Sequence, residues 1–291
     1  MKKNSTITIV LITLLALIWG SSFILMKKSV TVFSPLQIAA IRIFSAFVCF
    51  VPVLIINIKK LPSKKDWGYI FLTGLLGSLL PGICFGFAIS RIDSSLSSVL
   101  NSLTPIFTLL VGYLFYKNQI SKNQFWGMMT AFTGSILLVL AKSTTGISFS
   151  INPWSILIIL ATVMYGFNVN ILKTNLSHIG PLVLAACMLA TVGPIAGIIL
   201  LKSNFADVAF LPTSAKALSY TILLGVMGTG AATILFNWLL QITTPVLSSS
   251  VTYLVPIVAI FWGLLDNEVL FLQHYVGIVL ILIGVYWVNK N

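Results

Sequence analysis

Charged residues are scarce in this chain of 291 residues. They make up 8% of it, whereas hydrophobic residues make up 58%. A water-soluble domain carries about 25% charged residues, so this composition excludes a soluble globular protein. Apolar runs of roughly 20 residues recur, and each is long enough to cross a hydrocarbon core of about 30 Å as a helix. We therefore expect an all-α polytopic membrane protein.

Acidic residues and histidines are fewer still, and none lies in the middle of an apolar segment. They occupy loops or segment ends, at Asp66, Asp93, Asp207, Asp266, Glu268, His178 and His274. An ionisable residue at membrane depth is the usual sign of a proton relay. A metal centre needs a His/Asp/Glu set, and covalent catalysis needs a nucleophile with a base. We expect no metal, no cofactor and no enzymatic activity.

The net charge of +12 comes from Lys and Arg residues scattered over short loops rather than gathered in one patch. Positive loops are typical of membrane proteins, so we expect the lipid bilayer and not nucleic acid as the partner. Counted by side, ten Lys or Arg residues lie on the side of the N-terminus and six on the other. This bias predicts that both termini lie in the cytoplasm.

Ten membrane spans are predicted, joined by short loops that contain proline or glycine. They are Ile7–Met26, Leu36–Asn57, Trp67–Ser90, Leu96–Tyr116, Gln124–Ala141, Trp154–Leu172, Leu182–Leu201, Ala217–Leu240, Val246–Leu265 and Leu272–Asn289.

The chain contains an internal repeat, because residues 97–140 recur as residues 248–286. The matching positions include Pro105 with Pro256, Gly127 with Gly277 and Gly134 with Gly284. Each unit has five spans, an odd number, so the second unit must enter the membrane from the opposite side. We expect a five-plus-five inverted repeat, with a first unit at residues 1–146 and a second at 147–291. In transporters of this architecture the substrate site lies near the midplane, between the repeats.

Pro105 and Pro256 fall near the middle of the fourth and ninth spans. A proline frees the carbonyl four residues earlier, here that of Asn101 or Thr252. Neutral polar groups at membrane depth are tolerated where protein or a water-filled cavity receives them. We expect these helices to line a cavity, on faces that also carry Ser98 in the first copy. The alternative is a packing kink whose hydroxyls bond back to their own helix.

Aromatic and amide side chains occupy matching places around these prolines. They are Trp19 with Tyr165, Ser22 with Asn168 and Phe85 with Phe236, together with Asn237 and Tyr253. Each aromatic residue by itself is more typical of a core or lipid-facing position. Together they predict an apolar-walled pocket with a few neutral hydrogen-bonding groups, the usual composition of a small-molecule site.

Arg42 lies about two turns inside the second span. An ionisable residue within a span indicates function by default, and here it would attract a carboxylate or phosphate. The alternative is a side chain that extends to the outer interface. The sequence favours neither interpretation.

The glycines that recur seven residues apart, Gly127 with Gly134 and Gly277 with Gly284, lie on one face of their helices. Small residues allow close helix approach. We expect the fifth and tenth spans to serve packing, or the formation of a homodimer, rather than the transport pathway.

These features resemble the EamA family of the drug/metabolite transporter superfamily. The resemblance rests on Trp19-Gly20-Ser21-Ser22-Phe23, on Arg42, and on the proline-centred and glycine-bearing helices that end each half. It implies a ten-helix transporter of the inner membrane that exports amino acids or related small metabolites through a central cavity. In the family a Gly-Glu pair often ends the proline-centred helix, but the first copy here has Lys117 and the second copy has Glu268.

The sequence is compatible with three functions. The favoured one is a secondary exporter of a small amphipathic solute, working by facilitated diffusion or exchange. A carrier of sugar phosphates or nucleotide sugars would need several basic groups in the cavity, and Arg42 has few companions. A non-transporting accessory protein is the third, since a duplicated fold alone does not prove transport.

Overall fold

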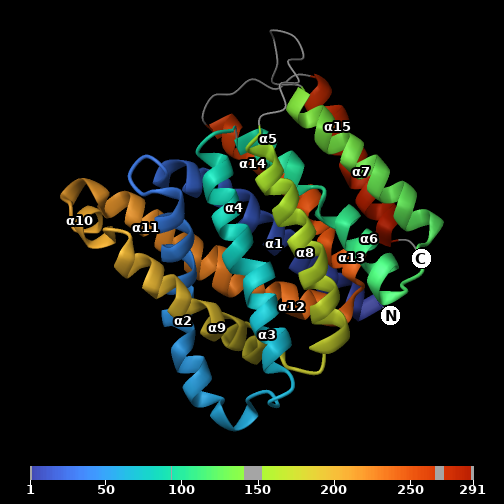
Figure 1. Ribbon diagram of the computed structural model, residues 1–291. Coiled ribbons are helices and arrows are strands. Elements are labelled where there is room, and N and C mark those ends of the chain that lie inside the picture. Colours follow the sequence, from blue (N-terminus) through green and yellow to red (C-terminus); the bar gives the residue numbers. More distant parts are fainter. Residues whose placement is uncertain (1, 93, 141–152, 266–271, 290–291) are drawn as a thin grey trace.

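The structure is a computed structural model that describes residues 2–92, 94–140, 153–265 and 272–289, and these residues form helices and no strands (Figure 1). The first half of the chain contains α1 (Lys2–Ser29), α2 (Pro35–Ile56), η1 (Ile58–Lys60), α3 (Trp67–Gly74), η2 (Leu75–Leu79), α4 (Leu80–Ile89), α5 (Ser94–Asn101), α6 (Thr104–Tyr116) and α7 (Lys122–Leu140). The predicted boundary between residues 146 and 147 lies outside the described residues, as do Asp93, Asp266 and Glu268.

The second half repeats this order, except that two short helices, α10 and η3, stand where the first half has η1. It contains α8 (Ser155–Asn175), α9 (Pro181–Lys202), α10 (Phe205–Ala209), η3 (Pro212–Ser214), α11 (Ala215–Leu223), η4 (Leu224–Ala231), α12 (Ala232–Ile242), α13 (Pro245–Ser249), α14 (Val251–Leu265) and α15 (Leu272–Asn289). Each predicted span falls on one of these helices or on a continuous run of them. The fold is the predicted ten-helix inverted repeat.

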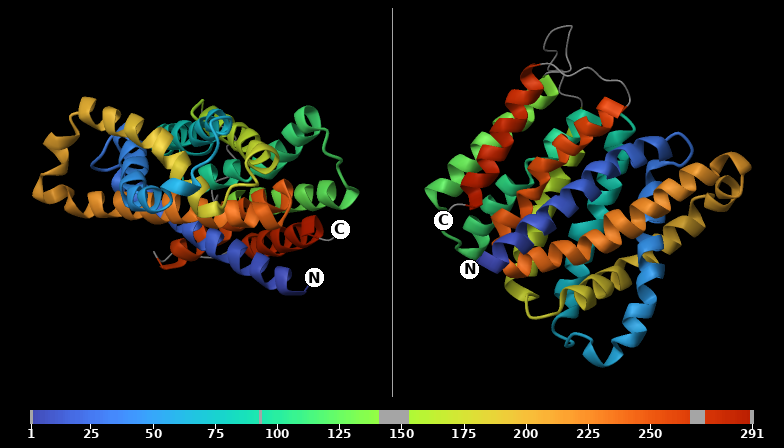
Figure 2. Two further views of the ribbon diagram at one scale, coloured as in Figure 1. Left: turned by 90° about the horizontal axis from the view of Figure 1, so that it is seen from below. Right: turned by 180° about the vertical axis from the view of Figure 1, so that it is seen from behind.

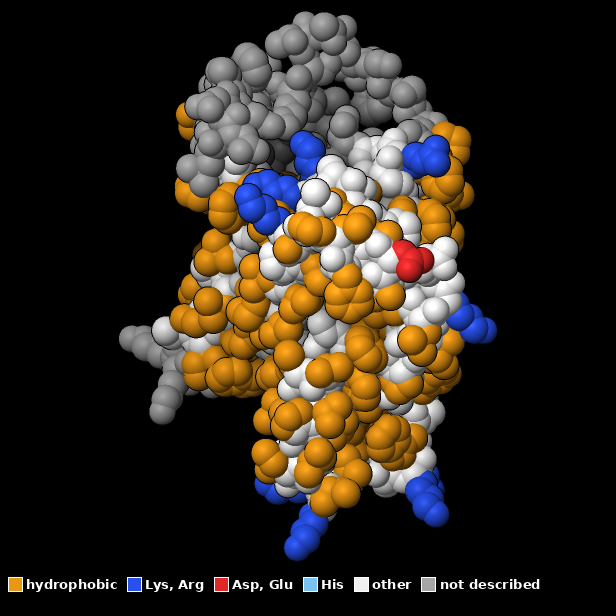
Figure 3. Space-filling view, turned by 90° about the vertical axis from the view of Figure 1, so that its left-hand side faces the viewer, with side chains coloured by type: hydrophobic (Ala, Val, Ile, Leu, Met, Phe, Trp, Pro, Cys, Tyr) orange, Lys and Arg blue, Asp and Glu red, His pale blue; other side chains and the backbone are white. Residues whose placement is uncertain are grey.

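The outer surface has the chemistry of a membrane-spanning protein. Within the described residues, six helices or helix runs are long and apolar enough to cross a bilayer, and three shorter helices are apolar as well. Figure 3 shows one face on which hydrophobic side chains cover the middle, while Lys and Arg side chains lie above it, below it and at the right-hand edge. Such a band matches the hydrocarbon core and its two polar interfaces.

The two repeats interlock instead of standing apart. Equivalent helices pack against each other, α2 on α9 and α7 on α15. The first helix of each repeat packs against the proline-centred helix of the other, α1 on α14 and α8 on α6. In the views of Figures 1 and 2 the start of α1 and the end of α15 lie near each other, which agrees with two ends on one side of the membrane after an even number of crossings.

The α7–α15 pair is held by the recurring glycines. A methyl group at Gly134 would lie 2.7 Å from the carbonyl oxygen of Gly277, and one at Gly127 would lie 2.7 Å from that of Gly284. Side chains at these positions would force the two backbones apart. The small-residue faces of the fifth and tenth spans are therefore used for packing within one chain, which was one of the two predicted uses.

The third span of each repeat contains a π-helical segment. In the first repeat this is η2, between α3 and α4, and in the second it is η4, between α11 and α12. A π-bulge shifts the register of the residues that follow it and is found frequently at functional sites. Both segments border the centre of the molecule, where they present Gly77 and Gly228.

The start of α2 fixes the depth of Arg42. Ser34 and Gln37 form a capping box, in which the Gln37 N–H donates to Ser34 Oγ at 3.3 Å and the Ser34 N–H donates to Gln37 Oε1 at 2.9 Å. Pro35 follows at the first helical position, where its missing N–H costs nothing. Because the helix starts here, Arg42 lies two turns inside it.

Candidate functional site

A cavity lies between the two repeats at the centre of the bundle. Its volume is about 150 Å³, and because one water needs about 10–15 Å³ on this measure, it holds on the order of ten non-hydrogen atoms. That is the size of an amino acid or a similar metabolite. The lining residues are Trp19, Ser22, Phe23, Met26, Arg42, Gly77, Ser78, Phe85, Asn101, Thr104, Tyr165, Asn168, Val169, Leu172, Met188, Gly228, Thr229, Thr233, Phe236, Asn237, Ser249 and Thr252.

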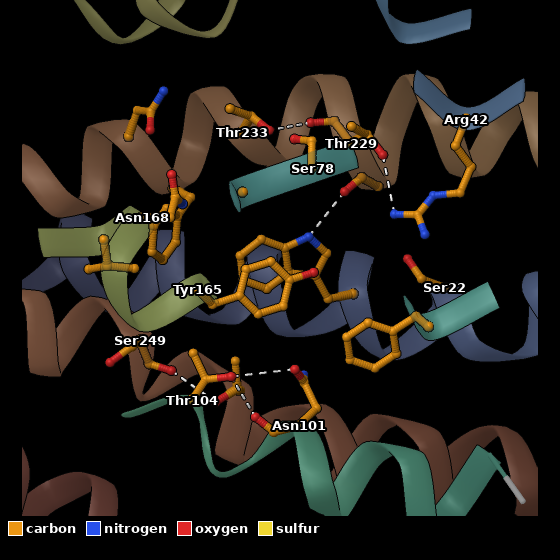
Figure 4. A pocket seen from close by; sticks show the side chains of 18 of the residues that line it. Ser22, Arg42, Ser78, Asn101, Thr104, Tyr165, Asn168, Thr229, Thr233 and Ser249 are labelled. Carbon is orange, nitrogen blue, oxygen red and sulfur yellow. Dashed lines mark hydrogen bonds between the residues drawn. The ribbon is translucent and has the colours of Figure 1, made fainter. Parts of the chain in front are cut away.

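The structure brings ten of the fourteen predicted site residues together in this lining. They are Trp19, Ser22, Arg42, Phe85, Asn101, Tyr165, Asn168, Phe236, Asn237 and Thr252. Figure 4 shows how the polar members converge from different helices: Arg42 and Thr229 lie beside each other, and Asn101 and Thr104 face Tyr165 from the opposite wall.

Four predicted residues do not line the cavity: Ser98, Pro105, Tyr253 and Pro256. The two prolines are absent from the lining although Asn101 and Thr252, four residues earlier, belong to it. Tyr253 is fully buried, and its hydroxyl donates to the carbonyl of Met128 on α7 at 3.3 Å. Its role is to join α14 to the α7–α15 pair.

The proline-centred helices are broken, but the breaks differ in place. In the first repeat α5 ends at Asn101 and α6 begins at Thr104, so Pro105 stands in the first turn of α6. In the second repeat the break falls at Ser250, and Pro256 lies inside α14. The sequence predicted two similar kinks at the prolines, and the positions of the breaks correct that prediction.

Hydroxyl groups take up the two carbonyls that the prolines were predicted to free. Thr104 Oγ1 donates to the carbonyl of Asn101 at 2.7 Å. Ser102 Oγ, from the first repeat, donates to the carbonyl of Thr252 in the second at 3.5 Å. Thr252 Oγ1 bonds back to the carbonyl of Ser249 at 3.0 Å. Cavity lining and back-bonded hydroxyls, posed as alternatives, therefore occur together.

The cavity lining is built from repeat-matched pairs. Nine pairs, separated by 146 residues in the first two spans and by 151 residues in the third and fourth, account for 18 of the 22 lining residues. They are Trp19/Tyr165, Ser22/Asn168, Phe23/Val169, Met26/Leu172, Arg42/Met188, Gly77/Gly228, Ser78/Thr229, Phe85/Phe236 and Asn101/Thr252.

Aromatic rings pack in two matched contacts that cross from one repeat to the other. Trp19 lies against Phe236, with ring centroids 5.6 Å apart, and its counterpart Tyr165 stacks on Phe85 at 6.4 Å. Trp19 Nε1 also donates to the carbonyl of Gly228 at 3.1 Å. These rings give the cavity apolar walls at fixed positions.

Arg42 supplies the charge in the lining. Its Nη2 donates to Thr229 Oγ1 at 3.3 Å, while its buried Nε has no hydrogen-bond partner among the described residues. The head group thus lies at the cavity, which decides between the two interpretations of this residue. No carboxylate or histidine is among the lining residues.

Lys173, near the end of α8, borders a small pocket that shares Leu172 and Asn237 with the cavity. Its Nζ donates to the carbonyls of Leu240 at 2.8 Å and Thr243 at 2.7 Å, where α12 ends. A lysine in this place satisfies carbonyls that a helix end leaves unpaired.

In the loops beyond, the Ser63 hydroxyl donates to Asp66, and this bond together with His178 at 3.4 Å holds the pKa of the Asp66 carboxyl below its ordinary value.

Sequence reasoning missed several lining residues, among them Ser78, Thr104, Met188, Thr229 and Thr233. Ser78 and Thr229 each follow a repeat-matched glycine, so the repeat itself contained the signal that could have found them. Met188 could have been found as the counterpart of Arg42. Thr233 could not, because the π-helix η4 sets which face of α12 points inward.

Comparisons with known proteins agree with this geometry. The profile described as the EamA-like transporter family matches residues 6–140 and again residues 152–290. An uncharacterized transporter of Archaeoglobus fulgidus is 25% identical over 97% of this chain and 98% of its own. The uncharacterized transporter YoaV of Bacillus subtilis is 24% identical over 93% and 92%.

Two further similarities concern location and fold. The uncharacterized inner membrane transporter YedA of Escherichia coli is 26% identical over 86% of this chain and 79% of its own. A crystal structure superposes with a TM-score of 0.76 at 14% identity, covering 98% of this chain and 97% of the other. The second similarity shows the fold alone.

Proposed function

The chain belongs to the EamA-like transporter family, and we propose that it is a secondary exporter of amino acids or related small metabolites in the inner membrane. Family membership makes it a multi-pass membrane transporter. The finer proposal rests on the cavity, which has a volume of about 150 Å³, aromatic walls, one guanidinium group and several neutral hydrogen-bonding groups. Substrate enters from one side and leaves from the other as the repeats rock about this site.

The cavity supports a monovalent carboxylate better than a phosphate ester. A sugar phosphate or nucleotide sugar carries about two negative charges near pH 7, as a phosphomonoester does, and would need more than one cation. Arg42 is the one Lys or Arg among the lining residues. A carboxylate accepts two hydrogen bonds from a guanidinium in a matching plane, and Arg42 Nε is free to donate.

Transport in this proposal runs by facilitated diffusion or exchange. A proton-coupled carrier needs a titrating group that the substrate displaces, and among the described residues no carboxylate or histidine lines the cavity. Both termini lie in the cytoplasm in this proposal, on the side with more Lys and Arg residues.

The test is solute flux into proteoliposomes that contain the purified protein. Counter-flow of a radiolabelled amino acid, driven by unlabelled amino acid on the other side, is the expected result. Sugar phosphates tested in the same way serve as the competing class. Absence of flux for all solutes, from protein that is folded by size-exclusion chromatography, would favour an accessory role. Uphill accumulation of a non-titrating solute driven only by a pH gradient would contradict facilitated diffusion or exchange.

A further inference from the structure

Two amide side chains in the cavity have carbonyl oxygens without a partner. Asn168 Oδ1 and Asn237 Oδ1 are buried and make no hydrogen bond among the described residues. The two residues are 7% and 2% exposed. A buried acceptor left unpaired destabilises the folded state, and native structures rarely contain one. Both residues line a ligand-sized cavity, so a turn of either amide would offer its unpaired oxygen to a ligand.

Asn168 lies where it does because its neighbour on η2 is a glycine. A methyl group at Gly77 would lie 2.8 Å from Asn168 Nδ2, so any other residue at position 77 would displace the amide. The matched position in the other repeat has a shorter side chain: Ser22 Oγ is 3.0 Å from where a methyl group would stand at Gly228. The second repeat therefore has the amide of Asn168 where the first repeat has the hydroxyl of Ser22.

Asn237 is held weakly and can turn. Its Nδ2 approaches Met188 Sδ at 3.9 Å, and a thioether is a poor acceptor. Asn237 also borders a small satellite pocket next to the cavity. A rotation of the amide plane would present its oxygen to a ligand without breaking a strong hydrogen bond.

Arg42 lies away from this end of the cavity. Figure 4 shows Arg42 and Asn168 on opposite sides of Tyr165. One substrate group therefore cannot meet both, and a substrate that fills the cavity must carry two separated polar ends.

We propose that Asn168 and Asn237 form a specificity subsite for an N–H or O–H donor at the far end of a substrate whose carboxylate lies on Arg42. The inference rests on the proposed function and narrows it to elongated acids with a terminal donor, such as amino acids whose side chain ends in an amine, a phenol or an indole N–H. A site that hydrogen-bonds such a group rejects the analogue without it, because the buried acceptors then stay unpaired.

The test uses matched pairs of amino acids that differ in the terminal donor: tyrosine with phenylalanine, lysine with norleucine, and tryptophan with 1-methyltryptophan. Binding is measured as ligand-induced thermal stabilisation. In at least one pair we expect the donor-bearing member to bind about tenfold more tightly, the ratio that about 1.4 kcal/mol gives. Asn168→Leu and Asn237→Leu are expected to remove this preference by weakening the donor-bearing member alone.

Two further variants keep the experiment decisive. Asn237→Asp retains an acceptor, so it should retain the preference even where Asn237→Leu folds poorly. Thr130→Val, at an exposed position on α7, controls for general effects of substitution. Equal binding within all pairs, or equal losses for both members in the Leu variants, would overturn the subsite while leaving amino-acid transport intact. Failure of the wild-type protein to bind any of the six would overturn the proposed substrate class and the subsite with it.

A second inference comes from the lysines that end the first helix of each repeat. Lys173 caps α12 through the carbonyls of Leu240, Gln241 and Thr243, at 2.8, 3.3 and 2.7 Å. Its counterpart 146 residues earlier is Lys27, which is exposed. The carbonyls that match those of α12 would belong to Ile89, Ser90 and Ile92, at the end of α4 on the opposite side of the membrane.

The geometry points to a pair of alternating latches. Inverted repeats exchange their conformations when access to the site alternates. In that exchange Lys173 releases α12 and opens the N-terminal end of the cavity, while Lys27 caps α4 and closes the other end. Hydrogen bonds from a charged ammonium group to three carbonyls are stronger than neutral ones, so their loss or gain biases a two-state equilibrium.

The test measures access to a reporter at Leu172→Cys, which borders both the cavity and the satellite pocket under Lys173. Native cysteines are first replaced, and an impermeant thiol reagent is applied from the N-terminal side. Lys173→Met is expected to raise the labelling rate about tenfold, and Lys27→Met to lower it. Lys173→Arg should restore the wild-type rate, and Lys65→Met, in an exposed loop, is the control. Changes of the same sign in both Met variants, or no change, would overturn the latches.

Discussion

The two repeats line the cavity with the same structural elements but with different side chains at some matched positions. Both supply an aromatic ring from the first helix, a π-bulge with a glycine from the third, and a polar side chain beside the broken fourth helix. Yet at one matched position the first repeat has Arg42 where the second has Met188, and at another it has Ser22 where the second has Asn168. In the proposed mechanism the similar shape of the repeats lets the cavity open to either side, and the difference in charge orients the substrate.

The largest effect is expected where the repeats are alike, at the α7–α15 pair. Gly134→Leu would place a side chain against the carbonyl of Gly277 and the backbone of Ile281. Overpacking of this kind costs about 1–3 kcal/mol or more, and here backbone atoms must move. We expect loss of monodisperse protein in size-exclusion chromatography. A Gly134→Leu variant that folds normally and changes substrate choice would show that these helices belong to the pathway.

The next effect concerns the position at which the repeats differ most. Arg42→Met gives the first repeat the side chain of the second, and it removes the one guanidinium from the cavity. A buried charge pair lost in this way typically costs about 2–5 kcal/mol, so we expect carboxylate flux to fall about 30-fold or more while folding is retained. Flux in proteoliposomes is the measurement. Unchanged flux would mean that Arg42 does not contact the substrate.

Arg42 also allows the asymmetry to be inverted. The double variant Arg42→Met with Met188→Arg moves the charge to the other repeat. Partial recovery of binding in the double variant, relative to Arg42→Met, would show that the repeats are interchangeable as carboxylate sites.

A smaller effect is expected at the polar pair beside the broken helices. Asn101→Leu or Thr252→Leu replaces a cavity-lining polar group by an apolar one of similar size. We expect flux to fall about tenfold or more, because a substrate polar group would then be left without a partner. Expression and thermal stability should stay close to wild type, which separates a loss of binding from a loss of fold. If both variants transport normally, these positions do not contribute to recognition.

The smallest effect concerns a bond that one repeat makes and the other does not. Trp19→Phe removes the hydrogen bond to the carbonyl of Gly228 but keeps an aromatic ring against Phe236. The expected cost is about 1 kcal/mol of stability, measured as a modest fall in melting temperature. Tyr165→Phe at the matched position is the comparison, and it should cost less in stability. An equal cost would show that the Trp19 bond contributes little.

Much of the architecture was predictable because it follows from local composition. Apolar runs of membrane length require helices, and an odd number of them per repeat requires inversion. The repeat also paired residues such as Trp19 with Tyr165 and Phe85 with Phe236, and the structure brings all four to one cavity. The residues of a helix that face the cavity could be predicted only where the helix has no π-helical segment and no break.

Packing between helices decided where the helices break and which way Tyr253 points, and sequence periodicity could not predict either. The chain breaks before Pro105 in one repeat and well before Pro256 in the other, because side-chain hydroxyls from neighbouring helices can satisfy the freed carbonyls at either place. Tyr253 is aromatic and adjacent to Thr252, yet it faces away from the cavity and bonds to Met128.

The sequence by itself determined that this protein is a duplicated, inverted bundle of membrane helices with a single arginine inside one of the apolar spans. Length, hydropathy and spacing are properties of the chain, so they can be read without coordinates. Only the tertiary structure decided that Arg42 faces the cavity, that Asn168 and Asn237 keep unpaired oxygens, and that Lys173 binds the end of α12. Each of these depends on a neighbour from a distant segment, and the identity of such neighbours is set by packing.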